Sequence, residues 1–255
     1  MEHWVISNGQ IGKYDTNKRP LYIYQRMRTK DNHILYLEEH LELINYGFEL
    51  LYGTPTTLTI EQVNKDCEKL LKKGGYQENA THILELRYDR YQNYSLRVLE
   101  TSLYKHFSVR AVRPKAHIFN IANLEINLPT SAAITANELL CTMARRYDCD
   151  IPLCIDDYGV LSSIDGTSPI IARGREIVIS QTIPSVELEM AYQALSNQTK
   201  YKITTSPISI EEATHADELF YIDYRGITAV GSLSDSFYSD NIAHTVIGAL
   251  NFRIQ

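Results

Sequence analysis

Hydrophobic and polar positions follow two rhythms along the chain, and the first predicts an α+β segment ahead of Arg113–Pro114–Lys115. Apolar residues recur at helical spacing from Leu37 to Leu51 and predict a helix that Gly53 ends. A second helix is predicted to begin at Thr59, which forms a capping-box pattern with Gln62. Alternating segments predict the strands of an antiparallel sheet: Trp4–Ser7, Leu21–Arg26, His82–Tyr88, Tyr94–Glu100 and Phe107–Val112.

After this boundary, predicted helices alternate with short strands. Ser209 and Glu212 form a second capping box at the head of a short helix. The pattern therefore predicts two domains, residues 1–115 (α+β) and 116–255 (α/β), each with a sheet flanked by helices. The predicted helices are Ala136–Tyr147, Ser185–Ser196 and Asp240–Leu250, and the predicted strands are Ile151–Asp156, Ile170–Ala172, Glu176–Ser180, Leu219–Ile222 and Ile227–Val230.

Composition excludes several classes of protein. A chain of 255 residues, 44% of them hydrophobic, can bury a full core. The net charge is −6 and no Lys/Arg stripe occurs, which argues against a nucleic-acid or membrane-surface partner. We find no signal-peptide pattern and no apolar run of transmembrane length. Four cysteines without a CxxC pair and eight histidines without ligand spacing predict reduced thiols and no metal site. The expectation is a cytoplasmic globular protein.

Three segments occur in an order and spacing that resemble one enzyme family. They are YLEEHLELINYGFELL (Tyr36–Leu51), IDDYGVLSS (Ile155–Ser163) and ISIEEATHADELFYIDYRGITAV (Ile208–Val230). Together they resemble the fold-type IV pyridoxal-phosphate (PLP) enzymes, which include D-amino-acid and branched-chain aminotransferases and aminodeoxychorismate lyase. The resemblance covers nearly the whole chain. It implies the two-domain α/β fold of D-amino-acid aminotransferase, a homodimer with active sites completed across the interface, and PLP chemistry. Fold alone does not carry that function.

The positions that the resemblance assigns to PLP anchors hold other residue types. The Schiff-base lysine falls on Thr130 or Ser131, and no lysine occurs between Lys115 and Lys200. Without an amine, the site has neither a covalent anchor nor a base for the proton shift at the substrate α-carbon. The arginine that the first helix presents to the cofactor phosphate falls on Leu43, which cannot make a charge-assisted contact.

Three further cofactor positions also differ from the family pattern. The glutamate that pairs with the pyridine nitrogen falls on Ser162 or Ser163. The phosphate-binding turn falls on Val186–Glu187–Leu188, and the remaining phosphate contact falls on Asp223 or Tyr224. A carboxylate about 4 Å from a phosphate charge costs on the order of 4 kcal/mol per charge pair at an effective dielectric near 20. Acidic side chains at positions 187, 189 and 223 are therefore expected to make this rim negative.

One strand retains candidates for a ligand pocket. Tyr24 aligns with a tyrosine that lines the family's pocket, while Gln25 replaces its acidic neighbour. Arg26 and Arg28 alternate to one face of the same strand. They form either a solvated or interface face or a binding site for a ligand carboxylate.

Three hypotheses of function remain open. The first is a degenerate homologue without PLP that keeps the scaffold for a small-molecule ligand or a protein partner. It is expected to form a homodimer whose interface involves the N-terminal sheet and the domain junction. The second is an active PLP-dependent aminotransferase or aminodeoxychorismate-lyase-like enzyme with an atypical site. The third is an unrelated tyrosine-rich α+β domain.

Overall fold

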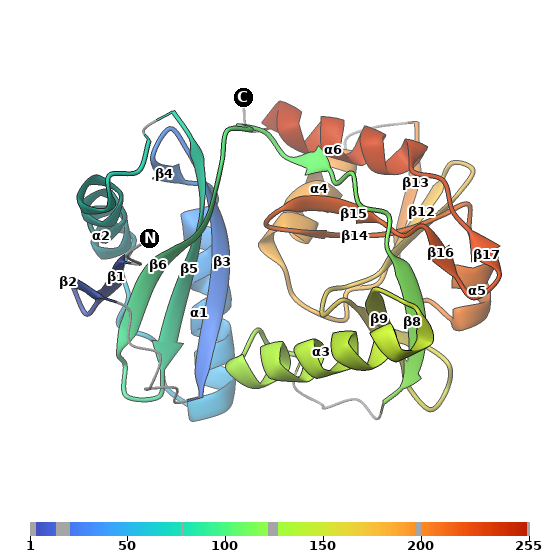
Figure 1. The fold of residues 1–255 in the computed structure, drawn as a ribbon, viewed down its shortest axis with the longest axis horizontal. Helices are drawn as coiled ribbons and strands as arrows, with labels where there is room; N and C mark the ends of the chain where they lie inside the picture. The colour runs from blue at the N-terminus through green and yellow to red at the C-terminus, as the bar shows by residue number, and fades with distance from the viewer. Residues whose placement is uncertain (1–3, 14–20, 78, 122–126, 197–199, 254–255) are drawn as a thin grey trace. The chain divides into compact units, whose positions relative to one another are not determined.

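The structure is a computed structural model that describes residues 4–13, 21–77, 79–121, 127–196 and 200–253 (Figure 1). Contacts within the chain divide it into two compact units. Unit 1 extends to Lys105 and adds Leu128–Ala132. Unit 2 comprises His106–Asn127 and the chain from Ala133 onward. Unit 1 therefore includes a short segment, Leu128–Ala132, that is separated in the sequence from the rest of the unit.

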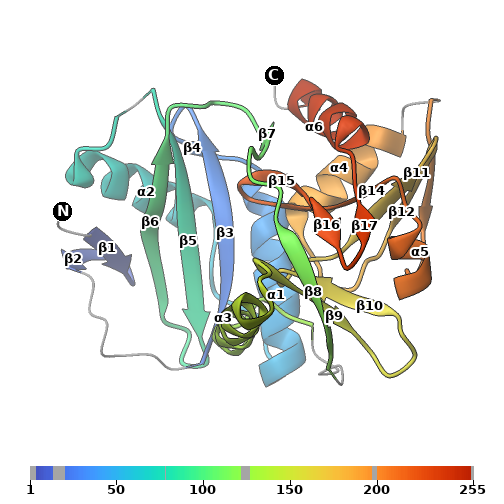
Figure 2. The ribbon, with the colours of Figure 1, turned by 45° about the vertical axis from the view of Figure 1, so that its right-hand side comes forward.

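Unit 1 is a six-stranded antiparallel sheet in the order β2-β1-β6-β5-β3-β4, with two helices packed on one face. The helices α1 and α2 run from Leu37 to Tyr52 and from Ile60 to Gly74 (Figure 2). The bounds of the strands are β1 Trp4–Ser7, β2 Gln10–Lys13, β3 Tyr22–Lys30, β4 His33–Ile34, β5 Thr81–Asp89 and β6 Tyr94–Ser102.

Both predicted helices of unit 1 are present, and their ends have identifiable causes. Gly53 ends α1 with φ 70°, and its N–H donates to the carbonyl oxygen of Glu49. The Thr59 hydroxyl caps α2 by accepting the Gln62 N–H at 3.2 Å. This bond is one half of the predicted capping box, and the Gln62 side-chain amide donates to the Tyr94 hydroxyl at 3.0 Å. Gln62 thus ties α2 to β6.

The core of unit 1 lies between the helices and the sheet. Alternate residues of the central strands face the helices, and the buried face of α1 carries Ile44 and Phe48 against them. Phe48 meets the fully buried Tyr88 edge-on, with ring centroids 5.0 Å apart. Burying each large apolar side chain contributes roughly 1.5–3 kcal/mol. The opposite face of the sheet carries the intervening residues of each strand.

Unit 2 contains two sheets with a shared apolar core. A six-stranded sheet has the order β13-β12-β11-β14-β15-β7, and a five-stranded sheet has the order β10-β9-β8-β16-β17. Helices α4 (Val186–Ser196) and α6 (Asn241–Arg253) pack together against the six-stranded sheet (Figures 1 and 2). The strands are β7 Ser108–Val109, β8 Lys115–Asn120, β9 Ile151–Ile155, β10 Leu161–Ile164, β11 Ile170–Arg173, β12 Glu176–Ile179, β13 Lys202–Thr205, β14 Glu218–Asp223, β15 Gly226–Ala229, β16 Ser232–Leu233 and β17 Ser236–Phe237.

The segment around the predicted boundary differs most from the sequence-based expectation. Only β7 remains of the strand predicted over Phe107–Val112, and it pairs in parallel with β15. That pairing depends on Gly226, which has φ 121° and where a Cβ atom would lie 2.2 Å from the Ser108 carbonyl oxygen. Strand β8 was not predicted, although it is central to its sheet. The helix predicted over Ala136–Tyr147 begins earlier, as α3 (Ser131–Ala144), and continues as a 3₁₀ turn.

The other predicted helices of unit 2 are present. The capping box of Ser209 and Glu212 is complete: the serine hydroxyl accepts the Glu212 N–H and the glutamate accepts the Ser209 N–H. It heads the short helix α5, Ile210–Thr214.

The four cysteines are not disulfide-bonded. Cys67, Cys149 and Cys154 are buried, and Cys141 is half-buried. Burial raises the pKa of all four thiols, to about 12 for Cys67 and Cys141. Within the described ranges, no helix is long and apolar enough to cross a membrane. The same part of the chain holds no group of three or more His, Cys, Asp or Glu side chains that could bind a metal ion.

Candidate functional site

In unit 1, the positions assigned to the missing lysine lie beside β3. The Tyr24 N–H donates to the Pro129 carbonyl oxygen at 2.9 Å, and the Tyr22 N–H donates to the Ser131 Oγ at 3.3 Å. Thr130 forms an antiparallel bridge with the same strand. The structure therefore brings Thr130 and Ser131 next to Tyr24, the tyrosine expected to line the pocket. Both hydroxyl side chains are half-buried.

Arg26 belongs to a charged cluster on the sheet face opposite α1 and α2. Its Nε lies 3.2 Å from Glu85, a carboxylate with 0% exposure. Arg87 and Arg97 reach the same carboxylate at 2.5 and 2.7 Å. Burial alone raises the pKa of Glu85, but the charges of Arg97, Arg87 and Arg26 outweigh it and hold that pKa below its ordinary value. Arg26 is therefore part of a buried ion cluster that pattern analysis did not predict.

Arg28 and Leu43 occupy different surroundings in the same unit. Arg28 is buried, and its Nη2 donates to the Tyr104 carbonyl oxygen at 2.7 Å. Burial lowers the pKa of Arg28. Leu43 is half-buried on α1, beside the buried core residue Ile44. The helix thus presents an apolar side chain at the position that the resemblance assigns to an arginine.

Gln25, the residue next to Tyr24, contacts a buried histidine. His40 on α1 lies with its Nδ1 2.9 Å from the Gln25 Oε1. Burial lowers the pKa of His40 to about 3, so the ring is neutral at physiological pH. Gln25 therefore serves as a neutral partner between β3 and α1.

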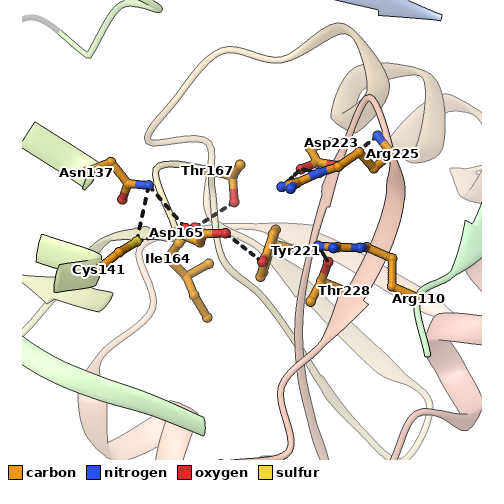
Figure 3. Close-up of polar contacts among 10 residues, drawn as sticks. All are labelled: Arg110, Asn137, Cys141, Ile164, Asp165, Thr167, Tyr221, Asp223, Arg225 and Thr228. Atoms are coloured by element: carbon orange, nitrogen blue, oxygen red, sulfur yellow. Dashed lines mark hydrogen bonds and ion pairs between the residues drawn. The ribbon is translucent and has the colours of Figure 1, made fainter. Parts of the chain in front are cut away.

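In unit 2, the core between the two sheets becomes polar toward one end of β14 (Figure 3). The Tyr221 hydroxyl donates to Asp165 at 2.9 Å, and the Asn137 amide of α3 donates to the same carboxylate at 3.1 Å. Thr228, paired with Tyr221 across the strands, accepts from Arg110 at 3.3 Å. These residues form a polar region that extends from α3 to the segment after β7.

Asp223 and Arg225 form an ion pair at the turn between β14 and β15 (Figure 3). The Asp223 Oδ2 accepts from the Arg225 Nε at 2.9 Å and Nη2 at 2.5 Å, and its Oδ1 accepts the Arg225 backbone N–H at 2.8 Å. Burial lowers the pKa of Arg225, but Asp223 outweighs it and the net direction is upward. The carboxylate is therefore neutralised locally, and the rim is less negative than the acidic residues alone suggest. Tyr224 is buried with its ring 5.1 Å from the same guanidinium.

The first turn of α4 occupies the position assigned to the phosphate-binding turn. Val186, Glu187 and Leu188 are all buried, and the Ser185 hydroxyl donates to the Glu187 Oε2 at 3.2 Å. Burial raises the pKa of Glu187 to about 7 and Asp223 adds to the rise, while hydrogen bonds from the Glu187 backbone and Ser185 oppose it. A carboxyl group of the chain itself thus lies at this helix N-terminus.

Two further positions complete the comparison with the sequence expectation. Glu189 is exposed and accepts from Gln193 at 2.8 Å, so it lies away from the buried turn. Ser162 is buried on β10, whereas Ser163 is half-buried and lies opposite Cys154 of β9 in the strand register. Residues 151, 153 and 155 of β9 face the apolar core, so Cys154 and Ser163 lie on the other face of that sheet.

Sequence reasoning missed Arg110, Asp165, Tyr221 and Arg225 as members of the polar end of unit 2. The Asp-Tyr-Arg spacing at Asp223–Arg225 was a usable signal, since a carboxylate and a guanidinium two residues apart can meet across a tight turn. The Asp165 contacts had no local signal, because Tyr221 lies 56 residues away along the chain.

Comparisons with known proteins agree on the fold. The sequence matches the family model of amino-transferase class IV over residues 23–232. A branched-chain aminotransferase from the archaeon Thermoproteus uzoniensis, solved with norvaline, superposes with a TM-score of 0.80 at 12% identity, covering 98% of this chain and 94% of the other. An aminotransferase from Brucella abortus bound to PLP gives 0.77 at 14% identity and covers 100% and 99%.

A third similar structure belongs to a protein that is named for a different activity. The putative 4-amino-4-deoxychorismate lyase of Legionella pneumophila gives a TM-score of 0.73 at 15% identity, with 91% of this chain and 90% of the other covered. Among curated proteins, none matches the sequence. At these identities the solved structures establish the fold, and the family match covers most of the chain. The chain belongs to the amino-transferase class IV family.

Proposed function

We propose that this chain is a class IV aminotransferase-like protein that has lost PLP binding and transamination and keeps its scaffold for a small-molecule ligand or a protein partner. The observation that carries the proposal is the first turn of α4. Glu187 is buried there, and its carboxyl group receives the Ser185 hydroxyl. A phosphate dianion bound at this helix N-terminus would need the space that the Glu187 carboxyl group occupies and the hydrogen-bond donors that it uses. The chain's own acid competes directly with such a group.

Other positions support the same conclusion, and together they do not fit PLP. Thr130 and Ser131 beside β3 are hydroxyls and cannot form the covalent bond that a lysine amine makes. Leu43 offers no charge to a phosphate. Ser162 and Ser163 supply no carboxylate for a pyridine nitrogen. The cofactor would lose its anchor, its phosphate contact and its ring partner at once.

An active PLP-dependent aminotransferase or aminodeoxychorismate-lyase-like enzyme with an atypical site is the alternative. One observation favours it: Arg110 and Arg225 place guanidinium groups at the polar end of unit 2 (Figure 3). Guanidinium groups bind phosphate well. The proposal is preferred because Arg225 is held by Asp223, and because an arginine supplies no substitute for the lysine.

The purified protein is expected to be colourless and to stay so after incubation with PLP. The physical reason is that no amine is available at positions 130 and 131 to form an internal aldimine. The measurement is the visible absorption spectrum before and after borohydride reduction, with excess cofactor removed by dialysis. The variants Thr130→Lys and Ser131→Lys are expected to remain colourless too, because Glu187 still occupies the turn of α4.

A visible band that borohydride removes from the wild-type protein would establish the alternative enzyme. A band in the lysine variants alone would show that the amine was the one missing element and that Glu187 does not exclude the phosphate. Lys115→Ala is a matched control, because Lys115 is the nearest preceding lysine in the sequence. It should leave the spectrum unchanged.

We further propose that the protein is a homodimer. The resemblance implies one, and two-fold dimers are the commonest soluble assembly. Unit 1 exposes Leu103 and Tyr104, each at 78%. Unit 2 exposes Leu139 and Tyr147 at 61% and 57%. Light scattering at micromolar concentration should give about twice the 29.2 kDa chain mass. A monomer at that concentration would contradict this assembly.

A further inference from the structure

Helix α3 is apolar in composition, yet most of its surface is exposed (Figure 1). Its sequence is SAAITANELLCTMA, in which Glu138 is the one charged residue. All 14 residues of this helix are described, and Ala144 is the one that is buried. Helices of globular proteins ordinarily bury their apolar side chains against another element. The fold of the single chain therefore leaves much of the apolar surface of α3 in water.

One face of α3 is attached to unit 2 by polar contacts. Asn137 and Cys141 lie one turn apart, and both reach the Asp165 Oδ1 after β10, at 3.1 and 3.5 Å. The buried Ala144 follows Cys141 by three residues on the same side of the helix. These contacts fix which face of α3 points away from unit 2.

The face opposite Asn137 and Cys141 carries an exposed apolar stripe, formed by Ala136, Leu139 and Met143. Leu139 is 61% exposed and Met143 is 36% exposed. The intervals of three and four residues are those of a seam between two packed helices. The α3 stripe thus has the spacing that a second helix would fit.

Two exposed residues of opposite charge flank the α3 stripe on one side. Glu138 precedes Leu139, and Arg145 follows the end of the helix. They are seven residues apart, which is about two turns and about 10 Å along the helix axis. This separation exceeds that of the (i, i+4) ion pairs that a single helix supports. Each charge is therefore placed for a partner outside its own helix.

The arrangement of these residues is complementary to itself. An antiparallel second copy of α3 that places the partner's Met143 against Leu139 also brings the partner's Arg145 beside Glu138. A two-fold axis repeats both contacts, so a single register gives two apolar contacts and two ion pairs. A parallel copy would instead set like residues side by side, including the two Glu138 carboxylates. Charge complementarity therefore favours a second, antiparallel copy of this chain as the occupant of the stripe.

We propose that α3 forms the centre of a two-fold interface, packing antiparallel against α3 of a second copy through the α3 stripe and two Glu138–Arg145 ion pairs. This surface rests on the homodimer proposed above and names the element that forms it. A specific interface buries about 800 Å² on each partner. Helix α3 is about 21 Å long and supplies the core of such an area. Tyr147, 57% exposed just beyond the helix, adds to it.

Charge reversal tests the ion pairs, with dissociation measured by sedimentation of the full chain over a dilution series. Glu138→Arg and Arg145→Glu each place like charges together at two symmetric positions, and each should raise the dissociation constant of the dimer at least about tenfold. The double variant Glu138→Arg/Arg145→Glu should return to within about threefold of the wild type, because both pairs form again with reversed sign. Recovery in the double variant reports a contact between chains, since the two residues are two turns apart in one chain.

The apolar contact has its own variant and a matched control. Leu139→Glu should make the protein monomeric at micromolar concentration, because it places a carboxylate in the centre of the seam. Phe237→Glu is the control, since Phe237 on β17 is also large, apolar and exposed, at 83%. It should leave the dimer intact. All of the substituted side chains are exposed, and circular dichroism checks that each variant is folded.

The possible results separate this interface from the proposals on which it rests. A wild-type dimer whose dissociation constant none of the α3 variants changes would overturn the α3 interface and leave the homodimer standing. A wild-type protein that is monomeric throughout the series would overturn both. If Leu139→Glu does not fold, the charge-reversal series decides, and a double variant no tighter than either single variant contradicts the interface. A visible PLP band would overturn the proposed loss of cofactor binding without affecting these measurements.

Discussion

Replacing Glu85 with alanine is expected to lower the free energy of unfolding by about 3–5 kcal/mol, the range for removing one partner of a buried ion cluster. Glu85 has 0% exposure, and three guanidinium groups converge on its carboxylate from β3, β5 and β6. Its removal leaves their charges facing one another without the group that offsets them. Urea denaturation followed by fluorescence measures this directly, because Trp4 is the single tryptophan and lies on β1 in unit 1.

The matched control is Glu100→Ala, since Glu100 lies on the adjacent strand β6 and is exposed. It should change stability by less than about 0.5 kcal/mol. Because the arginines hold the pKa of Glu85 below its ordinary value, the cluster's contribution is present above that ordinary pKa and is lost as the pH falls through the lowered one. Equal effects of the two substitutions would mean that the guanidiniums contribute nothing through Glu85.

The second large effect is expected for Glu218→Gln, which should destabilise the protein by on the order of 3 kcal/mol. The buried Glu218 carboxylate accepts the backbone N–H groups of Ile242 and Ala243 and the hydroxyl of Ser239. It therefore caps α6 from β14 with a full negative charge at the positive end of the helix. A glutamine keeps the shape but offers one acceptor oxygen and no charge. Thermal unfolding followed by circular dichroism provides the measurement.

Glu211→Gln provides the comparison for that substitution. Glu211 is an exposed acid in the first turn of α5. The Glu211→Gln substitution should leave the midpoint of thermal unfolding nearly unchanged. Amide exchange in the first turn of α6 should accelerate in Glu218→Gln and not in Glu211→Gln. Unchanged exchange there would show that other groups satisfy these N–H donors and that the cap is dispensable.

The sequence predicted those elements whose causes are local. The apolar spacing of α1, the Thr59 cap of α2 and the capping box at Ser209 depend on residues within a turn or two of each other. Strand β8 could not be predicted in this way, because it is set by pairing with β9 and β16 from distant parts of the chain. The shortening of β7 likewise reflects a distant residue, Gly226, against which it packs.

The candidate site was predictable to a smaller degree. The resemblance assigned candidate positions to the first turn of α4 and to Asp223. Burial of Glu187 and neutralisation of Asp223 by Arg225 depend on three-dimensional contacts. Arg26 was assigned to either a surface or a ligand, and its contact with Glu85 follows from a cross-strand register that the sequence does not state. The place of each candidate residue along the chain could be predicted from the sequence. Its burial and the partner that offsets its charge could not.

The four reduced cysteines make the chain its own reporter of unfolding. Their thiols are buried or have raised pKa values, so alkylating reagents at neutral pH meet few reactive thiolates while the fold is intact. Cys67 belongs to unit 1, and the other three belong to unit 2. A pulse of alkylation followed by mass spectrometry therefore adds one label when only unit 1 opens and three when only unit 2 opens. The mass of the labelled chain thus distinguishes which unit gives way first, without any engineered probe.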